Sequence, residues 1–126
     1  MKISVKVKGN YSKVRQWLNR IKDKEYLNIL DRYGKRGVDA LRFYTPKDTG
    51  KTADSWGYEI HHTQDTTTIT WTNDNINNGV SIAVILQYGH GTGTGGYVQG
   101  VDYINPAMGP VFDEISKELW EEVSRI

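Results

Sequence analysis

The pattern of apolar and polar positions predicts an N-terminal strand followed by a helix. Apolar and polar residues alternate from Ile3 to Lys8, which is the period of a half-buried strand. Ser12 follows and is a suitable N-cap residue. The next apolar positions fall on one face of a helix: Val14, Trp17, Leu18 and Ile21.

A second helical pattern runs from Tyr26 to Tyr44, with apolar residues three, four and seven positions apart. The helix must end before Pro46, because the residue preceding a proline is disfavoured in the helical conformation. Gly34 and Gly37 lie inside this pattern, where each glycine costs about 1 kcal/mol relative to alanine. We expect them to mark a bend, or a face where another backbone comes close.

The middle of the chain predicts antiparallel strands. Trp56–His62 and Thr66–Thr72 form two β-prone runs joined by a turn at Gln64-Asp65, and one face of the second run carries Thr67, Ile69 and Trp71. Asn73–Gly79 is predicted to be a loop. Ile82–Leu86 is apolar at consecutive positions, and its β-branched content favours a buried strand over a short helix.

A terminal helix is predicted after Asn105-Pro106, which suit an N-cap and a first helical position. Because Pro110 lacks a backbone donor, we expect the regular helix to begin at Gly109. Its apolar positions repeat every four residues: Val111, Ile115, Leu119 and Val123.

These elements predict a single α+β domain over residues 1–126. The architecture is an N-terminal strand and helices, an antiparallel sheet of three to five strands, and a C-terminal helix packed on the sheet. A composition with 37% hydrophobic and 25% charged residues is that of a soluble globular domain. The chain has no cysteine and no apolar run long enough to span a membrane. We therefore expect no disulfides and no membrane association.

Charge is distributed unevenly. Residues 1–51 hold 14 Lys or Arg and 5 Asp or Glu, whereas residues 52–126 hold 2 and 10. The two halves either neutralise each other within one fold or form complementary faces that meet between subunits. A third possibility is a DNA-contacting module, whose basic residues would be Lys13, Arg15, Arg20, Lys22, Lys24, Arg32, Lys35, Arg36 and Arg42. These residues are interleaved with acids, so a solvated helix face is favoured over nucleic-acid binding.

A glycine-rich loop over residues 89–102 dominates the remaining sequence, and loops of this length are usually functional insertions. Its Gly91-Thr-Gly-Thr-Gly-Gly96 run fits a dinucleotide-binding spacing, but no helix follows to hold a pyrophosphate. We expect instead a protein-docking loop that is poorly ordered in an isolated subunit. The candidate contact residues are Tyr88, Gly89, His90, Gly91, Gly93, Gly95, Gly96, Tyr97 and Tyr103.

Motifs for catalysis are weak. Asp48-Thr49-Gly50 is the tripeptide of dimeric aspartic proteases, but it follows a predicted helix and a polar segment, and as a turn Asp48 needs no further role. His61 and His62 are adjacent on a strand and so point to opposite faces. We expect no enzymatic activity, no cofactor and no metal, and keep the protease as a remote alternative.

Three blocks together resemble the small tail-component proteins of long-tailed bacteriophages and prophages, which join head to tail or complete the tail. The first block is Thr45-Pro-Lys-Asp-Thr-Gly-Lys-Thr-Ala-Asp-Ser-Trp56. The second is Ala83-Val-Ile-Leu-Gln-Tyr-Gly89, and the third is Tyr103-Ile-Asn-Pro-Ala107. The blocks occur in the family's order, over about residues 26–125. Gln87 departs from the family, which commonly has an acid before the aromatic-glycine pair.

The resemblance implies a non-enzymatic structural protein of the virion neck or tail, made in the cytoplasm of the bacterial host. Its partners would be other neck or tail proteins, namely a connector, a tail terminator or a tail tube. It would form a homo-oligomeric ring in the virion and could be a monomer when isolated. A head-to-tail ring needs two different complementary faces on each subunit. If the basic and acidic halves supply them, salt would weaken assembly.

Overall fold

The structure is a computed structural model that describes residues 1–8, 23–47, 50–63 and 66–124. Four sequence predictions lie wholly or partly outside these residues. They are the first helix, the Asp48-Thr49 pair of the protease motif, the turn at Gln64-Asp65, and the DNA-contact candidates Lys13, Arg15, Arg20 and Lys22. Over the described residues the α+β class is confirmed, with helices and antiparallel strands in small sheets.

A three-stranded antiparallel sheet forms one layer of the fold. Its order is β1 (Lys2–Lys8), β3 (Thr66–Asn73) and β2 (Trp56–His62), with β3 in the centre. All three strands were predicted from the sequence. The register pairs Trp71 with Ile3 on one side and with Tyr58 on the other. These residues share the apolar face of the sheet, because side chains directly opposite each other in a ladder point the same way.

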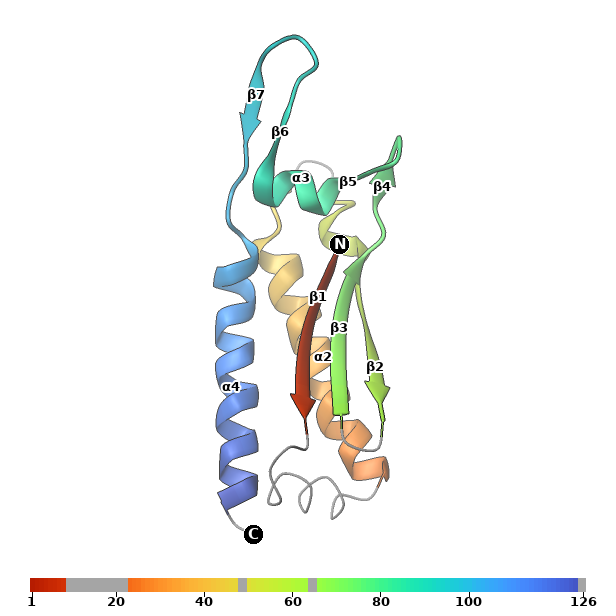
Figure 1. The fold of residues 1–126 in the computed structure, drawn as a ribbon, viewed down its shortest axis with the longest axis vertical. Helices are drawn as coiled ribbons and strands as arrows, with labels where there is room; N and C mark the ends of the chain where they lie inside the picture. The colour runs from red at the N-terminus through yellow and green to blue at the C-terminus, as the bar shows by residue number, and fades with distance from the viewer. Residues whose placement is uncertain (9–22, 48–49, 64–65, 125–126) are drawn as a thin grey trace.

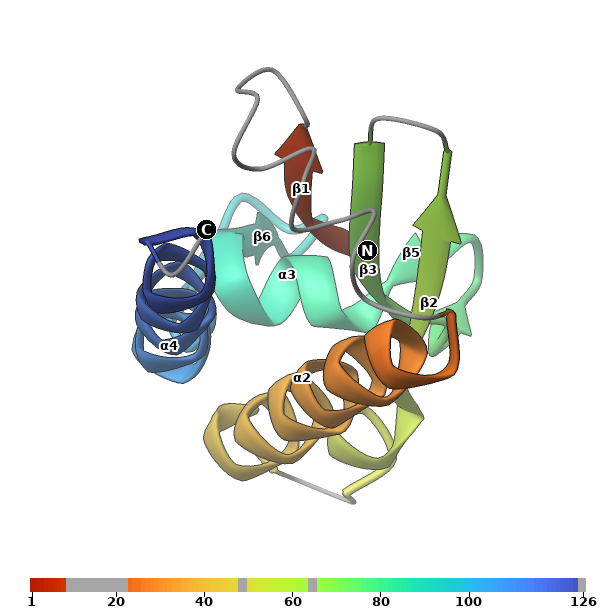
Figure 2. The ribbon, with the colours of Figure 1, turned by 90° about the horizontal axis from the view of Figure 1, so that it is seen from below.

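Two long helices form the second layer. Helix α2 (Asp23–Tyr44) lies across the apolar face of the sheet, and α4 (Ile104–Ser124) runs beside α2 (Figures 1 and 2). The ring of Phe112 on α4 lies 6.1 Å from that of Trp71, centroid to centroid. The core fills the space between the layers, and its largest fully buried side chains are Trp71, Tyr103, Leu41 and Met108.

The start of α4 differs from the prediction. The helix begins at Ile104 rather than Gly109 and continues through Pro110. Gly109 helps to explain this, since it has no Cβ to clash with the ring of the proline that follows it. The cap also differs: the Asp102 carboxylate accepts a hydrogen bond from the Asn105 backbone N–H at 3.2 Å.

Helix α2 was predicted correctly, and its two glycines have a definite role. A Cβ on Gly37 would lie 2.3 Å from Nε1 of Trp71, and one on Gly34 would lie 2.3 Å from the Tyr58 ring. The helix therefore meets aromatic rings of the sheet at these positions, not another backbone. Trp71 also donates a hydrogen bond from Nε1 to the Gly34 carbonyl at 2.9 Å.

The prediction of a strand at Ile82–Leu86 is wrong. These residues belong to a short helix, α3 (Ile82–Tyr88), which buries Ala83 completely and leaves the other apolar side chains half-buried. Tertiary context overrides β-propensity here, because this segment crosses the end of the two layers (Figure 1). Gly89, with φ +85°, ends the helix and donates its N–H to the Ile85 carbonyl.

Two small hairpins occupy segments that were predicted to be loops. Strands β4 (Ile76–Asn77) and β5 (Val80–Ser81) pair across Asn78-Gly79, where both residues have positive φ. Strands β6 (Gly89–Gly91) and β7 (Tyr97–Gln99) form the second hairpin within the glycine-rich stretch. The two hairpins lie on opposite sides of α3 at the same end of the molecule (Figure 1). A one-turn 3₁₀ helix, η1 (Ala53–Ser55), precedes β2.

Candidate interaction surface

The β6–β7 hairpin projects away from the rest of the described chain (Figure 1). Every residue from 91 to 99 is exposed, so both faces of the hairpin lie in solvent. Its base is tight: a Cβ on Gly100 would lie 2.5 Å from the Gly89 nitrogen. The Tyr97 hydroxyl donates a 2.7 Å hydrogen bond to the Tyr88 carbonyl. The stretch predicted as one long loop therefore contains a short hairpin, and its poor ordering in an isolated subunit stays a prediction.

The candidate glycines have two distinct placements. Gly89 and Gly91 lie in β6, whereas Gly93, Gly95 and Gly96 form the exposed tip. Gly93 and Gly95 have φ of +81° and +89°, a conformation that glycine adopts without strain. The glycines therefore allow the turn and the close approach at the base of the hairpin.

Eight of the nine candidate contact residues lie in or beside the hairpin. Tyr88 and Tyr97 are 66% and 65% exposed, and His90 lies in β6 with its Nδ1 buried and without a hydrogen-bond partner among the described residues. Tyr103 is different, because it is only 2% exposed and donates a 2.7 Å hydrogen bond to the Ala83 carbonyl. Tyr103 is thus a core residue that joins α3 to α4, and we remove it from the contact set.

Gln87 joins the hairpin base to the start of α4. Its side-chain oxygen accepts hydrogen bonds from the backbone N–H groups of Tyr103 and Ile104, at 3.1 and 3.2 Å. Its Nε2 donates to the Asp102 carboxylate at 2.9 Å. Hydrogen bonds from Gln87, and then from Asn105, hold the pKa of Asp102 below its ordinary value. The amide at position 87 is therefore used as both acceptor and donor.

We expect Gln87→Ala to lower the free energy of unfolding by about 1 kcal/mol, because α4 loses part of its N-terminal capping. Gln87→Glu keeps the acceptor but places a second carboxylate beside Asp102, so it should also destabilise the fold. Urea unfolding at neutral pH measures both effects. Asp102→Asn should rescue Gln87→Glu, and a double variant no more stable than Gln87→Glu would contradict this arrangement.

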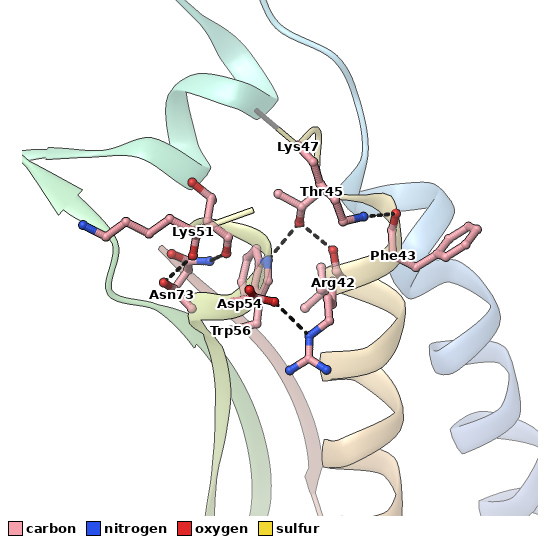
Figure 3. A network of polar contacts seen from close by, with 11 residues as sticks. Arg42, Phe43, Thr45, Lys47, Lys51, Asp54, Trp56 and Asn73 are labelled. Carbon is pink, nitrogen blue, oxygen red and sulfur yellow. Dashed lines mark hydrogen bonds and ion pairs between the residues drawn. The ribbon is translucent and has the colours of Figure 1, made fainter. Parts of the chain in front are cut away.

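A buried polar network holds Thr45 and Thr52, two described residues between α2 and β2. Trp56 donates from Nε1 to the Thr45 hydroxyl at 2.9 Å, and that hydroxyl donates to the Leu41 carbonyl at 2.5 Å (Figure 3). Asn73 donates to the Thr52 carbonyl at 2.8 Å. The described parts of the first family-like block, on either side of residues 48–49, are thus held by these hydrogen bonds, and we call them the support.

A groove of about 460 Å³ lies between this support, α3 and the β4–β5 hairpin. Its apolar lining comes from Pro46, Ile76, Ile82 and Leu86. Among the described residues that line it, Lys51 alone is charged, and its side chain extends away from the network (Figure 3). The groove is therefore a depression with one charged residue in its described lining, and strand β4 runs along its side.

Three arginines of α2 make ion pairs with acids of the same chain. Arg32 on α2 donates from Nη2 to both carboxylate oxygens of Glu118 on α4, at 2.7 and 2.8 Å. Arg36 pairs with Glu114, and Arg42 lies 3.6 Å from Asp54. Three of the arginines considered for DNA contact thus face acids of the same chain. At these positions the basic and acidic halves meet inside one fold.

The run of sequence that carries both hairpins has no Asp, Glu, Lys or Arg. It spans the residues between Asp74 and Asp102, although 25% of the whole sequence is charged. Six of the nine exposed large hydrophobic residues of the described chain lie in this run: Ile76, Val80, Tyr88, Tyr97, Val98 and Val101. We name residues 75–101 the uncharged end. The sequence analysis did not include its isoleucine and valines among the candidate contact residues. The absence of charged residues over this run could have indicated them.

Comparison with protein-family models gave no match, and searches of the curated proteins and of the solved structures gave none either. In the part of the chain that the structure describes, no three His, Cys, Asp or Glu side chains come close enough to hold a metal ion. No helix there combines the length and apolar character that crossing a bilayer requires.

Proposed function

We propose that this chain is a structural assembly protein of a long-tailed bacteriophage or prophage. It would act as a non-enzymatic tail-completion or head–tail joining component, in a ring at the neck or tail end of the virion. Its neighbours would be a connector, a tail terminator or a tail tube. The proposal rests on the resemblance of the three blocks, together with the surface that they frame.

The uncharged end is the observation that carries the proposal. The centre of a protein–protein interface is depleted of charged residues and enriched in tyrosine, and this end has both properties. Free strand edges are normally protected by charges, prolines or bulges. The uncharged hairpins β4–β5 and β6–β7 are each two-stranded and have no such charges.

The three family-like blocks lie around the base of this surface. The first block supplies the support beneath the groove, and the second supplies α3 and Gly89. The third begins at Tyr103, whose hydroxyl is bonded to α3. The residues that resemble the family therefore hold the hairpins in position, which is the arrangement expected of a scaffold for docking.

The test is complementation of a phage or induced prophage from which the gene for this chain has been deleted. We expect electron microscopy to show separate heads and tails, and the wild-type chain to restore joined, infectious particles. Tyr88→Ala/Tyr97→Ala should fold but restore few particles. Trp120→Ala is the matched control, because Trp120 is an equally exposed aromatic residue, at 72%, on α4 outside the uncharged end. Normal particles from the deletion strain would overturn the proposed function.

A further inference from the structure

We propose that the β6–β7 hairpin of one copy docks into the groove beside β4 of the next copy. The proposal deepens the proposed function, on which it rests, by naming the partner of the hairpin and the surface that receives it. The contact is between two different faces of the same chain, so it is repeated from copy to copy around a ring.

The two faces lie on opposite sides of the uncharged end. In Figure 1 the β6–β7 hairpin rises on one side of α3, and the β4–β5 hairpin lies on the other. The groove is on the β4 side, since Ile76 and Asn77 of that strand line it. A head-to-tail contact requires a donor face and an acceptor face that do not overlap, and this arrangement provides both.

The groove suits the hairpin as a binding surface because both have few charged residues. Burying the neutral hairpin against a charged surface would take those charges out of water without giving them new partners, which is costly even for charges already paired within the chain. The surface between α2 and α4 is of that kind, since it is lined by Arg32, Arg36, Lys117 and several glutamates. The groove presents apolar side chains and amides instead, with Lys51 as its single charged lining residue in the described chain.

The free edges of the strands favour the same pairing. Within the described ranges, β4 is paired with β5 alone and β7 with β6 alone, so each strand has one edge without a strand partner there. An extended segment that adds to such an edge gains main-chain hydrogen bonds, while its side chains enter neighbouring pockets. Tyr97 and Val98 are adjacent on β7 and point to opposite faces of the hairpin, so one of these two side chains would enter the groove while the other stays outside it.

The available area favours a closed ring over a simple dimer. A tyrosine side chain buries about 150–250 Å² when enclosed, so Tyr88 and Tyr97 at their observed exposures offer roughly 200–330 Å² together. A stable pair buries about 800 Å² per partner. One contact of this size is weak, but in a ring every copy uses it twice, once through its hairpin and once through its groove.

Cysteine cross-linking tests the contact directly, because the natural chain contains no cysteine. Val98→Cys marks the hairpin and Ile76→Cys marks the groove. The double variant should give a ladder of covalent multimers under oxidation or with a flexible bis-maleimide. A mixture of the two single variants should give mainly mixed dimers. Glu59→Cys/Asp113→Cys, which places both cysteines at exposed positions outside the uncharged end, is the control and should give no ladder.

The experiment is done both on the concentrated full chain and on particles from the complemented host. The ladder should be as strong in about 1 M salt, where the Debye length is about 3 Å, as in dilute buffer, because the contact is neutral. Dimers of the Val98→Cys variant alone would indicate a symmetric pair and overturn the proposal, as would no ladder above the control in either sample. Cross-linking in particles to a different virion protein would also overturn it, while leaving the proposed function intact.

Discussion

Gly37→Ala is expected to lower the free energy of unfolding by about 3 kcal/mol, although the same change in an exposed helix stabilises by up to about 1 kcal/mol. The new Cβ would lie 2.3 Å from Nε1 of Trp71. Trp71 is fully buried on the central strand and cannot swing into solvent. Moving its indole would also strain the hydrogen bond to the Gly34 carbonyl. Urea unfolding followed by tryptophan fluorescence measures the change.

Two comparisons isolate the cause of that loss. Gly57→Ala, on β2, places its Cβ where no atom lies within 4 Å, so it should be neutral or slightly stabilising. In a Trp71→Phe background the ring is smaller, and Gly37→Ala should cost clearly less than in the natural chain. Equal costs in both backgrounds would show that the glycine is not needed for the indole.

The sequence predicts the elements of this fold that have a clear period and fails where the period is ambiguous. Strand β3 alternates buried and half-buried residues along its first half, and α2 repeats its apolar residues at helical spacing. Ile82–Leu86 has no period at all, so its secondary structure depends on what it packs against. The glycine that follows was the better guide, because glycine at this position commonly ends a helix.

The β4–β5 hairpin was predictable from turn chemistry rather than from periodicity. Asn-Gly with both residues at positive φ is the most favoured two-residue hairpin turn, and Asn78-Gly79 is that pair. For the candidate site, the sequence indicated the glycine-rich stretch and its exposed tyrosines, whereas the groove needed the structure. Its lining comes from three segments that the chain brings together only by folding.

Tyr103 was assigned to the contact surface because aromatic residues in a glycine-rich stretch often mark interfaces. The sequence does not reveal that this tyrosine faces inward, since it lies at the junction of a loop and a helix. Its burial has a measurable consequence, because burial first, and the nearby Tyr88 second, raise the pKa of Tyr103 from 10.0 to about 12. An ionised phenol is disfavoured inside the core.

We expect the chain to lose stability as the pH rises from about 10 to about 12. In this range the unfolded chain releases the Tyr103 proton while the folded chain retains it, so unfolding becomes more favourable with pH. Because one pH unit corresponds to about 1.4 kcal/mol, a pKa raised from 10.0 to about 12 corresponds to a loss of up to about 3 kcal/mol. The contribution is fully present below pH 10, the pKa in the unfolded chain. Tyr58, whose pKa is raised by burial and by its hydrogen bond to Asp31, acts in the same direction.

Urea unfolding at a series of alkaline pH values measures this loss. Tyr103→Phe should cost about 1 kcal/mol at neutral pH, through the lost hydrogen bond to Ala83, and should be markedly less sensitive to pH between 10 and 12. Tyr44→Phe changes an exposed tyrosine and should keep the slope of the natural chain. The result that would contradict this account is the same pH dependence of unfolding free energy in Tyr103→Phe and in Tyr44→Phe. The Tyr103 hydroxyl would then not be the group that keeps its proton in the folded chain, and the junction of α3 and α4 would be open to water.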